Sequence, residues 1–353
     1  MTDANDKVRA VLERLITSGE VGLQVAAYKD GKLVIDTWAG LAEKDAGKPV
    51  DGDTLFPSFS SAKGPTATCV HIAVERGQMY YDDPLAKYWR EFAAKGKSAI
   101  TVRHVLTHRA GLPDDPAAFD KDPLNYDGIC AELAQTEPAY EPGSKTHYHG
   151  TTYGWLLART LQFVDGRRID RFMQDEVCRP LGLDSMFLGA PEDQEARVAT
   201  LYDDQVAMGR LRYNRSEFRR SVSPAGGLIT NARSLARMYA ALANNGELDG
   251  ARILPAGRID KATVLQTDAI DGRFKTATRK ALGYWLAGPG LTAAEGAGPN
   301  AFGHAGSGGS VGFADRERNY AFALTKNGLT STQESQPTAT IVEQAVEEAL
   351  GLK

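Results

Sequence analysis

Phe59-Ser60-Ser61-Ala62-Lys63 is the stretch from which the fold can be inferred, because it holds the only Ser-x-x-Lys of this 353-residue chain. On a helix, residues three apart lie on one face, so Ser60 and Lys63 would lie side by side. Serine is a poor nucleophile at neutral pH, and a lysine whose ammonium form is destabilised could remove its proton. Taken alone, the tetrapeptide favours a plainer interpretation, in which Ser60 caps a helix and Lys63 points into water.

The residues after the motif predict a buried helix that begins at Ser60. Pro65 would fall in its first turn, where a missing N–H group costs little, and Gly77 would end it. The N-terminus of a helix carries free N–H groups and the positive end of the helix dipole, which stabilise an oxyanion and lower the pKa of a nearby ammonium group. A broad apolar stripe would face the core, and it consists of Ala67, Cys69, Val70, Ala73 and Val74.

Length and composition are those of an ordinary globular protein. The chain is 42% hydrophobic and 24% charged, with a formal net charge of -4, and it could form one large domain or two lobes. Its one basic cluster, over 210–220, is short and also carries Glu217, so no nucleic-acid partner is expected. No apolar run approaches the ~20 residues that span a bilayer, so no membrane partner is expected.

The N-terminus and the cysteines favour a cytoplasmic protein. Residues 1–7 lead into an amphipathic pattern, where a secretory signal would have an apolar h-region. Cys69, Cys130 and Cys178 are widely spaced and odd in number, which is typical of reduced, buried thiols. We therefore expect a cytoplasmic chain without a disulfide framework.

Strand-like segments lie near both ends of the chain, with helical patterns between them. Asp30-Gly31 joins the first two strand-like runs and is a strong hairpin signal. The predicted strands cover 22–28, 32–38, 281–287, 309–314 and 320–325, and the predicted terminal helices cover 5–18 and 337–350. This order predicts one sheet assembled from both ends of the chain, with a mainly helical region inserted between them.

Further motifs follow Ser-x-x-Lys in a characteristic order. They are Val105-Leu106-Thr107-His108-Arg109-Ala110-Gly111-Leu112-Pro113, Glu141-Pro142-Gly143, Tyr148-His149-Gly150, Pro180-Leu181-Gly182-Leu183, Ala225-Gly226-Gly227-Leu228 and Gly303-His304-Ala305-Gly306. On these residues the chain resembles, from about 21 to 327, the class C β-lactamase and penicillin-binding-protein-like serine hydrolases, a group that includes the family VIII carboxylesterases.

The resemblance implies an α/β fold of the β-lactamase and transpeptidase type. An antiparallel sheet would be flanked by the N- and C-terminal helices, with the mainly helical region inserted. We expect a discontinuous α/β domain over 1–60 and 275–353, an inserted domain over 61–274, and the active site between the two.

The resemblance also assigns roles to residues. Ser60 would be the nucleophile that carries the acyl group, and Lys63 and Tyr148 would share the proton transfers, with the choice of general base open between them. The oxyanion hole would consist of the N–H groups of Ser60 and Ser307, next to Gly306, whose missing side chain permits close backbone approach. No metal or other cofactor is implied.

Two residues depart from the family pattern. Gly150 stands where the group has the asparagine of Tyr-x-Asn, so no side-chain amide is available for a substrate's acylamide. His304 stands where the group has a lysine, and it would contact the substrate as a largely neutral group. Both changes weaken recognition of the amide and carboxylate of a β-lactam. The expected substrate is a small-molecule carboxylic ester, since the esterases of this group tolerate such variation. Hydrolysis of amides or peptides, including D-amino-acid peptides and β-lactams, is the alternative.

Two other motifs suggest different chemistry. Gly308-Gly309-Ser310-Val311-Gly312 fits Gly-x-Ser-x-Gly, but a strand is expected after it and no histidine follows His304, so Ser310 is expected to be structural. His104 and His108 are four apart, yet no glutamate lies between them as in zinc proteases, so no metal site is predicted. A catalytically silent binding protein of the same fold is a third possibility, and the oligomeric state is left open.

Overall fold

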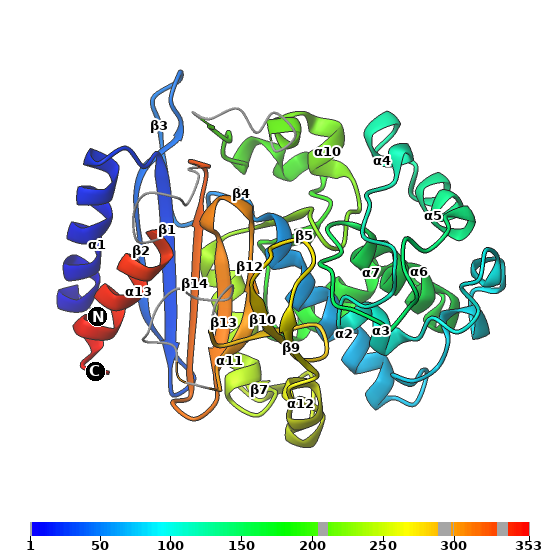
Figure 1. Cartoon of the computed structure of the whole chain (residues 1–353). Coiled ribbons are helices and arrows are strands. Elements are labelled where there is room, and N and C mark those ends of the chain that lie inside the picture. Colours follow the sequence, from blue (N-terminus) through cyan, green and yellow to red (C-terminus); the bar gives the residue numbers. More distant parts are fainter. Residues whose placement is uncertain (1, 204–210, 289–297, 299, 330–337, 353) are drawn as a thin grey trace.

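A nine-stranded sheet forms the centre of the computed structural model, which describes residues 2–203, 211–288, 298, 300–329 and 338–352 (Figure 1). Neighbouring strands run antiparallel in the order β3-β2-β1-β14-β13-β12-β11-β10-β9. The strands are β1 (Gly22–Lys29), β2 (Lys32–Glu43), β3 (Lys48–Pro49), β9 (Thr267–Ile270), β10 (Ala277–Lys280), β11 (Trp285–Leu286), β12 (Phe302–Ala305), β13 (Val311–Asp315) and β14 (Tyr320–Lys326).

Helices from the two ends of the chain lie on one face of this sheet, and the helical region lies on the other side (Figure 1). The helices are α1 (Thr2–Thr17), α2 (Lys63–Glu75), α3 (Val102–Leu106), α4 (Ala117–Lys121), α5 (Tyr126–Gln135), α6 (Thr152–Asp165), α7 (Ile169–Met173), α8 (Arg179–Leu181), α10 (Ser216–Arg220), α11 (Ala232–Ala243), α12 (Ala256–Thr263) and α13 (Thr338–Leu350). Two small sheets pair β4 (Phe56–Pro57) and β5 (Met186–Leu188) with β6 (Leu228–Thr230), and β7 (Glu247–Leu248) with β8 (Ala251–Arg252). The predicted α/β fold class is confirmed.

The two ends of the chain meet in the middle of the sheet. β1 pairs with β14, from Leu23 opposite Lys326 to Lys29 opposite Tyr320, and with β2 on its other side. Between β1 and β2, both residues of Asp30-Gly31 have positive φ (51° and 73°), as a type I′ hairpin requires. The predicted hairpin is confirmed.

The central strand β14 is buried on both faces, and its side chains alternate in size. Phe322 and Leu324 belong to the apolar cluster that α1 and α13 cover. Ala321 and Ala323 belong to the cluster on the opposite face, which α11 covers. Because successive side chains of a strand point to opposite faces, the small residues let α11 approach the sheet closely.

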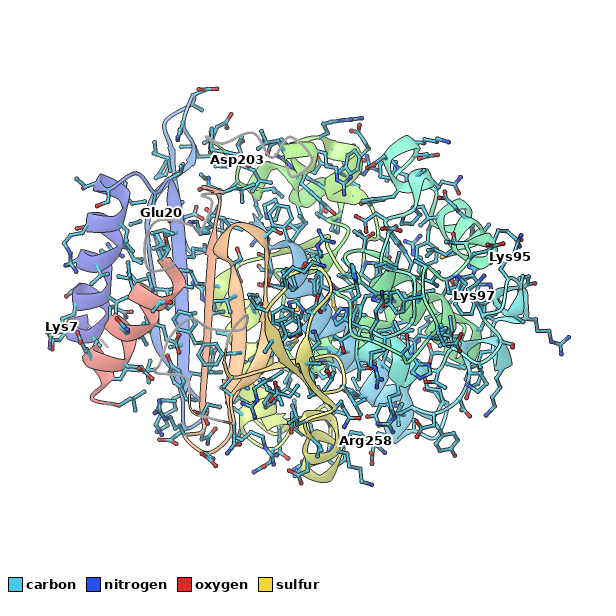
Figure 2. All side chains as sticks on the ribbon, in the orientation of Figure 1. Lys7, Glu20, Lys95, Lys97, Asp203 and Arg258 are labelled. Atoms are coloured by element: carbon cyan, nitrogen blue, oxygen red, sulfur yellow. The ribbon has the colours of Figure 1, made fainter. Side chains whose placement is uncertain are left out.

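Side chains fill the space between the sheet and the helices (Figure 2). Within the helical region, Lys97 is buried although it is charged (Figure 2). Its Nζ donates to the carbonyl oxygens of Ala94 (2.8 Å), Ala134 (3.0 Å) and Thr136 (2.6 Å). All three N–H groups of an ammonium are thus satisfied. No helix within the described ranges is long and apolar enough to cross a membrane.

Several predicted boundaries were wrong: β2 runs to Glu43, beyond its predicted end at residue 38, and three others have a clear local cause. α2 begins at Lys63, because Phe59–Ala62 forms a separate 3₁₀ turn before it. The strand predicted over 281–287 shrinks to β11, since Gly283 (φ 85°) turns the chain between β10 and β11. β13 begins at Val311, because Ser307–Gly309 forms a second 3₁₀ turn. Both 3₁₀ turns contain predicted site residues.

Candidate active site

Ser60 lies in the 3₁₀ turn that precedes α2. Phe59 has a positive φ of 48°, which is strained for an aromatic residue and turns the chain sharply before the serine. Ser60 is partly exposed, whereas Phe59 and Ser61 are buried. Lys63, the first residue of α2, brings its Nζ to 3.2 Å from Ser60 Oγ. The two residues of the Ser-x-x-Lys motif are therefore in contact.

Lys63 is fully buried, and two carbonyl groups hold its amine. Nζ donates to the carbonyl oxygens of Gly150 (2.7 Å) and Ala225 (2.8 Å). Burial lowers the pKa of Lys63 well below its usual value; the charge of Asp115 opposes this shift and that of Arg273 adds to it. Burial therefore favours the neutral amine form of Lys63.

Tyr148 lies against the same amine. Lys63 Nζ is 4.8 Å from the centroid of the Tyr148 ring, and hydrogen bonding by the Ser60 side chain favours a lower pKa of the phenol. Burial raises the pKa of Tyr148 and outweighs that hydrogen bond, so the side chain is a neutral phenol. His108 stacks on the ring with centroids 4.7 Å apart. The structure thus brings Ser60, Lys63 and Tyr148 together from distant parts of the chain.

A buried ion pair fixes the backbone at Tyr148. Asp271 Oδ1 accepts a hydrogen bond from the Tyr148 N–H (3.1 Å), and Asp271 Oδ2 lies 2.9 Å from Lys280 Nζ. Burial alone would raise the pKa of Asp271, but the hydrogen bond and charge of Lys280 lower it. Sequence reasoning missed this pair. Asp271-Gly272 is a hairpin signal, yet no local pattern connects it with Tyr148, which is more than a hundred residues away.

His304 lies on β12 and faces the same cluster of rings. It is 2% exposed, with its ring centroid 5.3 Å from that of Trp285 and 6.1 Å from that of Tyr148. Its Nδ1 is 2.7 Å from the Ala305 carbonyl oxygen, and its buried Nε2 has no hydrogen-bond partner among the described residues. Burial, with a smaller contribution from Lys63, lowers the pKa of His304 well below its usual value. The imidazole is neutral near neutral pH.

Gly306 lies directly against the turn that carries Ser60. A Cβ atom on Gly306 would be 2.2 Å from the carbonyl oxygen of Ser58 and 3.1 Å from Ser61 Oγ, so a side chain has no room there. Ser307 follows and is exposed. This contact joins β12 to the nucleophile turn at the position where the oxyanion hole was predicted.

The remaining candidates have structural partners. His104 Nδ1 accepts from the Thr101 N–H (3.3 Å), and His108 Nδ1 accepts from the His149 N–H (3.0 Å). Within the described part of the chain, no group of three or more His, Cys, Asp or Glu side chains is arranged to hold a metal ion. Ser310 is buried and precedes strand β13, as predicted for a structural residue.

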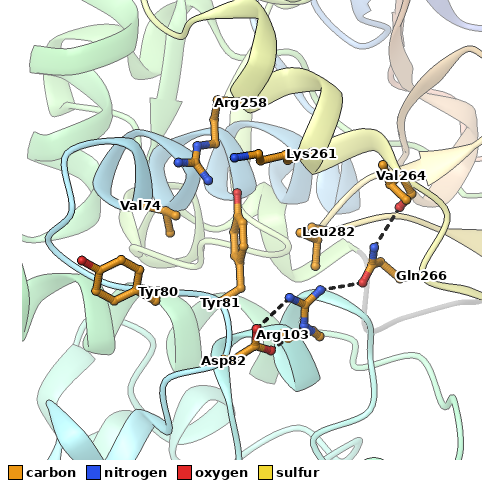
Figure 3. A pocket seen from close by; sticks show the side chains of 10 residues that line it. All are labelled: Val74, Tyr80, Tyr81, Asp82, Arg103, Arg258, Lys261, Val264, Gln266 and Leu282. Carbon is orange, nitrogen blue, oxygen red and sulfur yellow. Dashed lines mark hydrogen bonds and ion pairs between the residues drawn. The ribbon is translucent and has the colours of Figure 1, made fainter.

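A separate hollow of about 550 Å³ lies beside the end of α2 (Figure 3). Both of its arginines are already engaged: Arg103 binds Asp82 and Gln266, and Arg258 binds Glu75. It is lined by Val74, Tyr80, Tyr81, Asp82, Arg103, Arg258, Lys261, Val264, Gln266 and Leu282. No serine or cysteine nucleophile is in this lining, so the hollow is not the candidate active site.

The chain is similar over most of its length to known proteins. The family model described as "Beta-lactamase" matches residues 8–347. The esterase/beta-lactamase LipL of Mycobacterium tuberculosis is 34% identical over 339 residues, which are 88% of this chain and 78% of that protein.

Solved structures extend this similarity to the fold. A family VIII carboxylesterase superposes with a TM-score of 0.89 at 29% identity, covering 98% of this chain and 97% of that one. A penicillin-binding protein homologue from Caulobacter crescentus superposes with a TM-score of 0.85 at 30% identity, covering 99% and 97%.

Proposed function

The chain belongs to the beta-lactamase family, as its motifs predicted, and we propose that this hydrolase cleaves carboxylic esters through an acyl ester on Ser60. One observation carries the proposal: the buried amine of Lys63 lies 3.2 Å from Ser60 Oγ. The names of its relatives support the choice of ester substrates, because LipL is an esterase/beta-lactamase and a carboxylesterase has nearly the same fold.

The acceptors around Lys63 favour it as the general base. Two carbonyl groups accept N–H groups of Lys63, and its third partner, Ser60 Oγ, belongs to a hydroxyl that can accept from an ammonium group or donate to the lone pair of a neutral amine. Lys97 provides the contrast, since three carbonyls surround its amine and require the ammonium form. Lys63 therefore accepts the Ser60 proton as Oγ attacks the ester carbonyl carbon.

Tyr148 would relay this proton. Because its pKa is raised, the phenol keeps its proton and is a poor general base, but it can donate that proton to a departing alkoxide. When the tetrahedral intermediate collapses, Tyr148 donates to the alcohol oxygen and recovers a proton from the Lys63 ammonium. A water then attacks the acyl ester, its proton passes back by the same route to Ser60 Oγ, and the carboxylic acid leaves.

We propose the N–H groups of Ser60 and Ser307 as the oxyanion hole. The close contact of Gly306 with the Ser58 carbonyl supports this, because it holds the second turn against the first. Donors of this kind contribute about 3 kcal/mol each to transition-state stabilisation.

Two features support esters over β-lactams. Gly150 supplies no side-chain amide for an acylamide group, and His304 is buried and neutral where a lysine would attract a β-lactam carboxylate. The alternative is hydrolysis of amides, D-amino-acid peptides or β-lactams at the same site. The name of LipL, esterase/beta-lactamase, supports this alternative for β-lactams.

Labelling with a fluorophosphonate, followed by mass spectrometry, tests the nucleophile. We expect one adduct on the peptide that contains Ser60, with no adduct and no esterase activity in Ser60→Ala. Ser310→Ala is the matched control, because Ser310 is the other serine in a hydrolase-like motif, and it should keep both adduct and activity. Labelling that persists in Ser60→Ala would contradict the proposal.

A substrate panel tests the reaction. Para-nitrophenyl esters with short and medium acyl chains should be turned over with a higher kcat/KM than nitrocefin or a D-alanyl-D-alanine peptide. Faster turnover of the peptide than of every ester would favour the alternative function.

A further inference from the structure

The tip of the β9–β10 hairpin covers one edge of the candidate active site. Arg273 Cζ lies 5.8 Å from the centroid of the Tyr148 ring, and the Phe274 ring lies 5.0 Å from it. Asp271 Oδ1 accepts hydrogen bonds from the N–H groups of both residues, at 2.8 Å and 3.4 Å. The buried carboxylate that fixes Tyr148 therefore also fixes this rim.

The guanidinium group of Arg273 is exposed, and within the described part of the chain no ion pair or side-chain hydrogen bond engages it. Arg103 and Arg258, which line the separate hollow, are both paired with carboxylates. The N–H groups of the Arg273 guanidinium are therefore available to bind an anion next to Tyr148, the residue proposed to protonate the leaving group.

Gly150 lies between this guanidinium and Asp115, and its missing side chain lets both groups approach closely. A Cβ atom on Gly150 would lie 3.2 Å from Arg273 Nη1 and 3.1 Å from Asp115 Oδ1. Asp115 Oδ1 already accepts from the Thr151 N–H (3.1 Å) and hydroxyl (2.6 Å). The carbonyl group of Gly150 holds Lys63. A substrate group that reaches the exposed side of Arg273 meets a cation whose charge also acts on the proposed catalytic amine of Lys63.

We propose that Arg273 binds a carboxylate on the leaving-group side of the substrate, so that the enzyme prefers esters of aromatic alcohols that carry a carboxylate. This inference rests on the proposed esterase function. Phe274, which is 43% exposed, provides an apolar surface for the aromatic ring. The other groups at the reacting centre are neutral, so the guanidinium supplies the charge that recognises the anion, and Asp115 opposes it.

A matched pair of esters tests the proposal: meta-acetoxybenzoate and its neutral analogue meta-acetoxybenzamide. The measured quantity is the ratio of their kcat/KM values in each variant, which cancels differences in intrinsic reactivity. Arg273→Ala should lower the benzoate-to-benzamide ratio about tenfold. Asp115→Asn should raise it, because an opposing charge is lost while Thr151 keeps an acceptor. Arg90→Ala, which removes an exposed arginine on another element, should leave both values unchanged.

An unchanged ratio in Arg273→Ala would overturn the proposal. A second measurement does not depend on turnover: calorimetric titration of meta-acetoxybenzoate into Ser60→Ala and into Ser60→Ala/Arg273→Ala. We expect the affinity to fall about tenfold in the double variant. Equal affinities would refute the role of Arg273, whereas charge-dependent binding without any turnover in the wild type would refute the esterase function alone.

Discussion

At the scale of single residues, burial sets the charge of each ionisable group in the candidate site. It lowers the pKa values of Lys63 and His304 and raises that of Tyr148, so burial favours the neutral form of all three. The nearby charges of Asp115 and Arg273 lie at the exposed rim. When these side chains are neutral, the resting enzyme holds no buried unpaired charge. A proton then moves between oxygen and nitrogen only during the reaction.

The pH dependence of kcat/KM should follow from these shifts. Activity requires neutral Lys63, so it should fall as the pH drops through the lowered pKa of this residue and the amine gains a proton. On the alkaline side, Tyr148 must keep its proton, so no loss is expected until the pH exceeds the usual tyrosine value of about 10.

His304→Ala serves as the control for this profile. Since burial keeps the imidazole neutral, the variant should show the same inflections as the wild type in kcat/KM measured across this range. An inflection near pH 6.5, the usual histidine value, that disappears in His304→Ala would contradict the assignment.

Lys63→Arg should abolish catalysis while leaving a folded protein. A guanidinium cannot act as a base because it stays protonated, so kcat should fall by about a thousandfold or more. Lys95→Arg, a replacement of an exposed lysine, should have no effect on the rate. Substantial activity in Lys63→Arg would point to Tyr148 as the base.

At the scale of elements, one hairpin organises the site. Lys280, at the end of β10 away from the loop, pairs with Asp271 in the β9–β10 loop, and Asp271 holds both Tyr148 and the Arg273 backbone. Neither strand was predicted from the sequence, because both are short and largely polar and β9 is exposed. The pair gives these weak strands a fixed geometry.

Asp271→Ala should destabilise the protein by about 3 to 5 kcal/mol, because the Lys280 ammonium would be left buried without its partner. Urea unfolding measures the change. The double variant Asp271→Ala/Lys280→Met should recover part of this loss, since no unpaired charge remains. Equal stability of the single variant and the wild type would show that the pair is not needed for folding.

The packing of α11 on the sheet depends on a glycine of β13. A Cβ atom on Gly312 would lie 2.8 Å from side-chain atoms of Leu235 and Tyr239, both on α11. Gly312→Ala should therefore destabilise the protein by about 1 to 3 kcal/mol. Gly257→Ala is the control, because Gly257 lies in α12 with open space around its Cβ position, and its unfolding midpoint should stay the same or rise.

At the scale of the whole molecule, the sheet joins the two ends of the chain, and the candidate site lies where that sheet meets the helical region. β12 contributes His304, the residue after this strand is Gly306, and the helical side contributes Lys63 and Tyr148. We propose that 1–60 with 275–353 forms one domain and 61–274 the other, with the site between them; limited proteolysis would test this division.

Removal of α13 should unfold the chain although it contains no site residue. A chain that ends at residue 337 would expose Phe322 and Leu324, which α13 helps to bury. We expect loss of the cooperative thermal transition and of activity together. Val346→Ala, which only trims this contact, should give an intermediate melting temperature. An unchanged melting temperature after truncation would contradict the role of α13.

The sequence by itself determined the family, the fold class and the Asp30-Gly31 hairpin. These features rest on local patterns: ordered motifs, alternating strands near both ends, and a turn that only certain residues tolerate. The same motifs identified Ser60, Lys63, Tyr148, Ser307, His304 and Gly306 as candidates, and their roles stay predictions.

Only the tertiary structure decided which groups surround these candidates. The carbonyl groups of Gly150 and Ala225 accept hydrogen bonds from the Lys63 amine, and Asp271 fixes the backbone of Tyr148 and Arg273. Such contacts join positions that are far apart in the chain. Burial and protonation depend on what packs around a group in space, and no local sequence pattern encodes that environment.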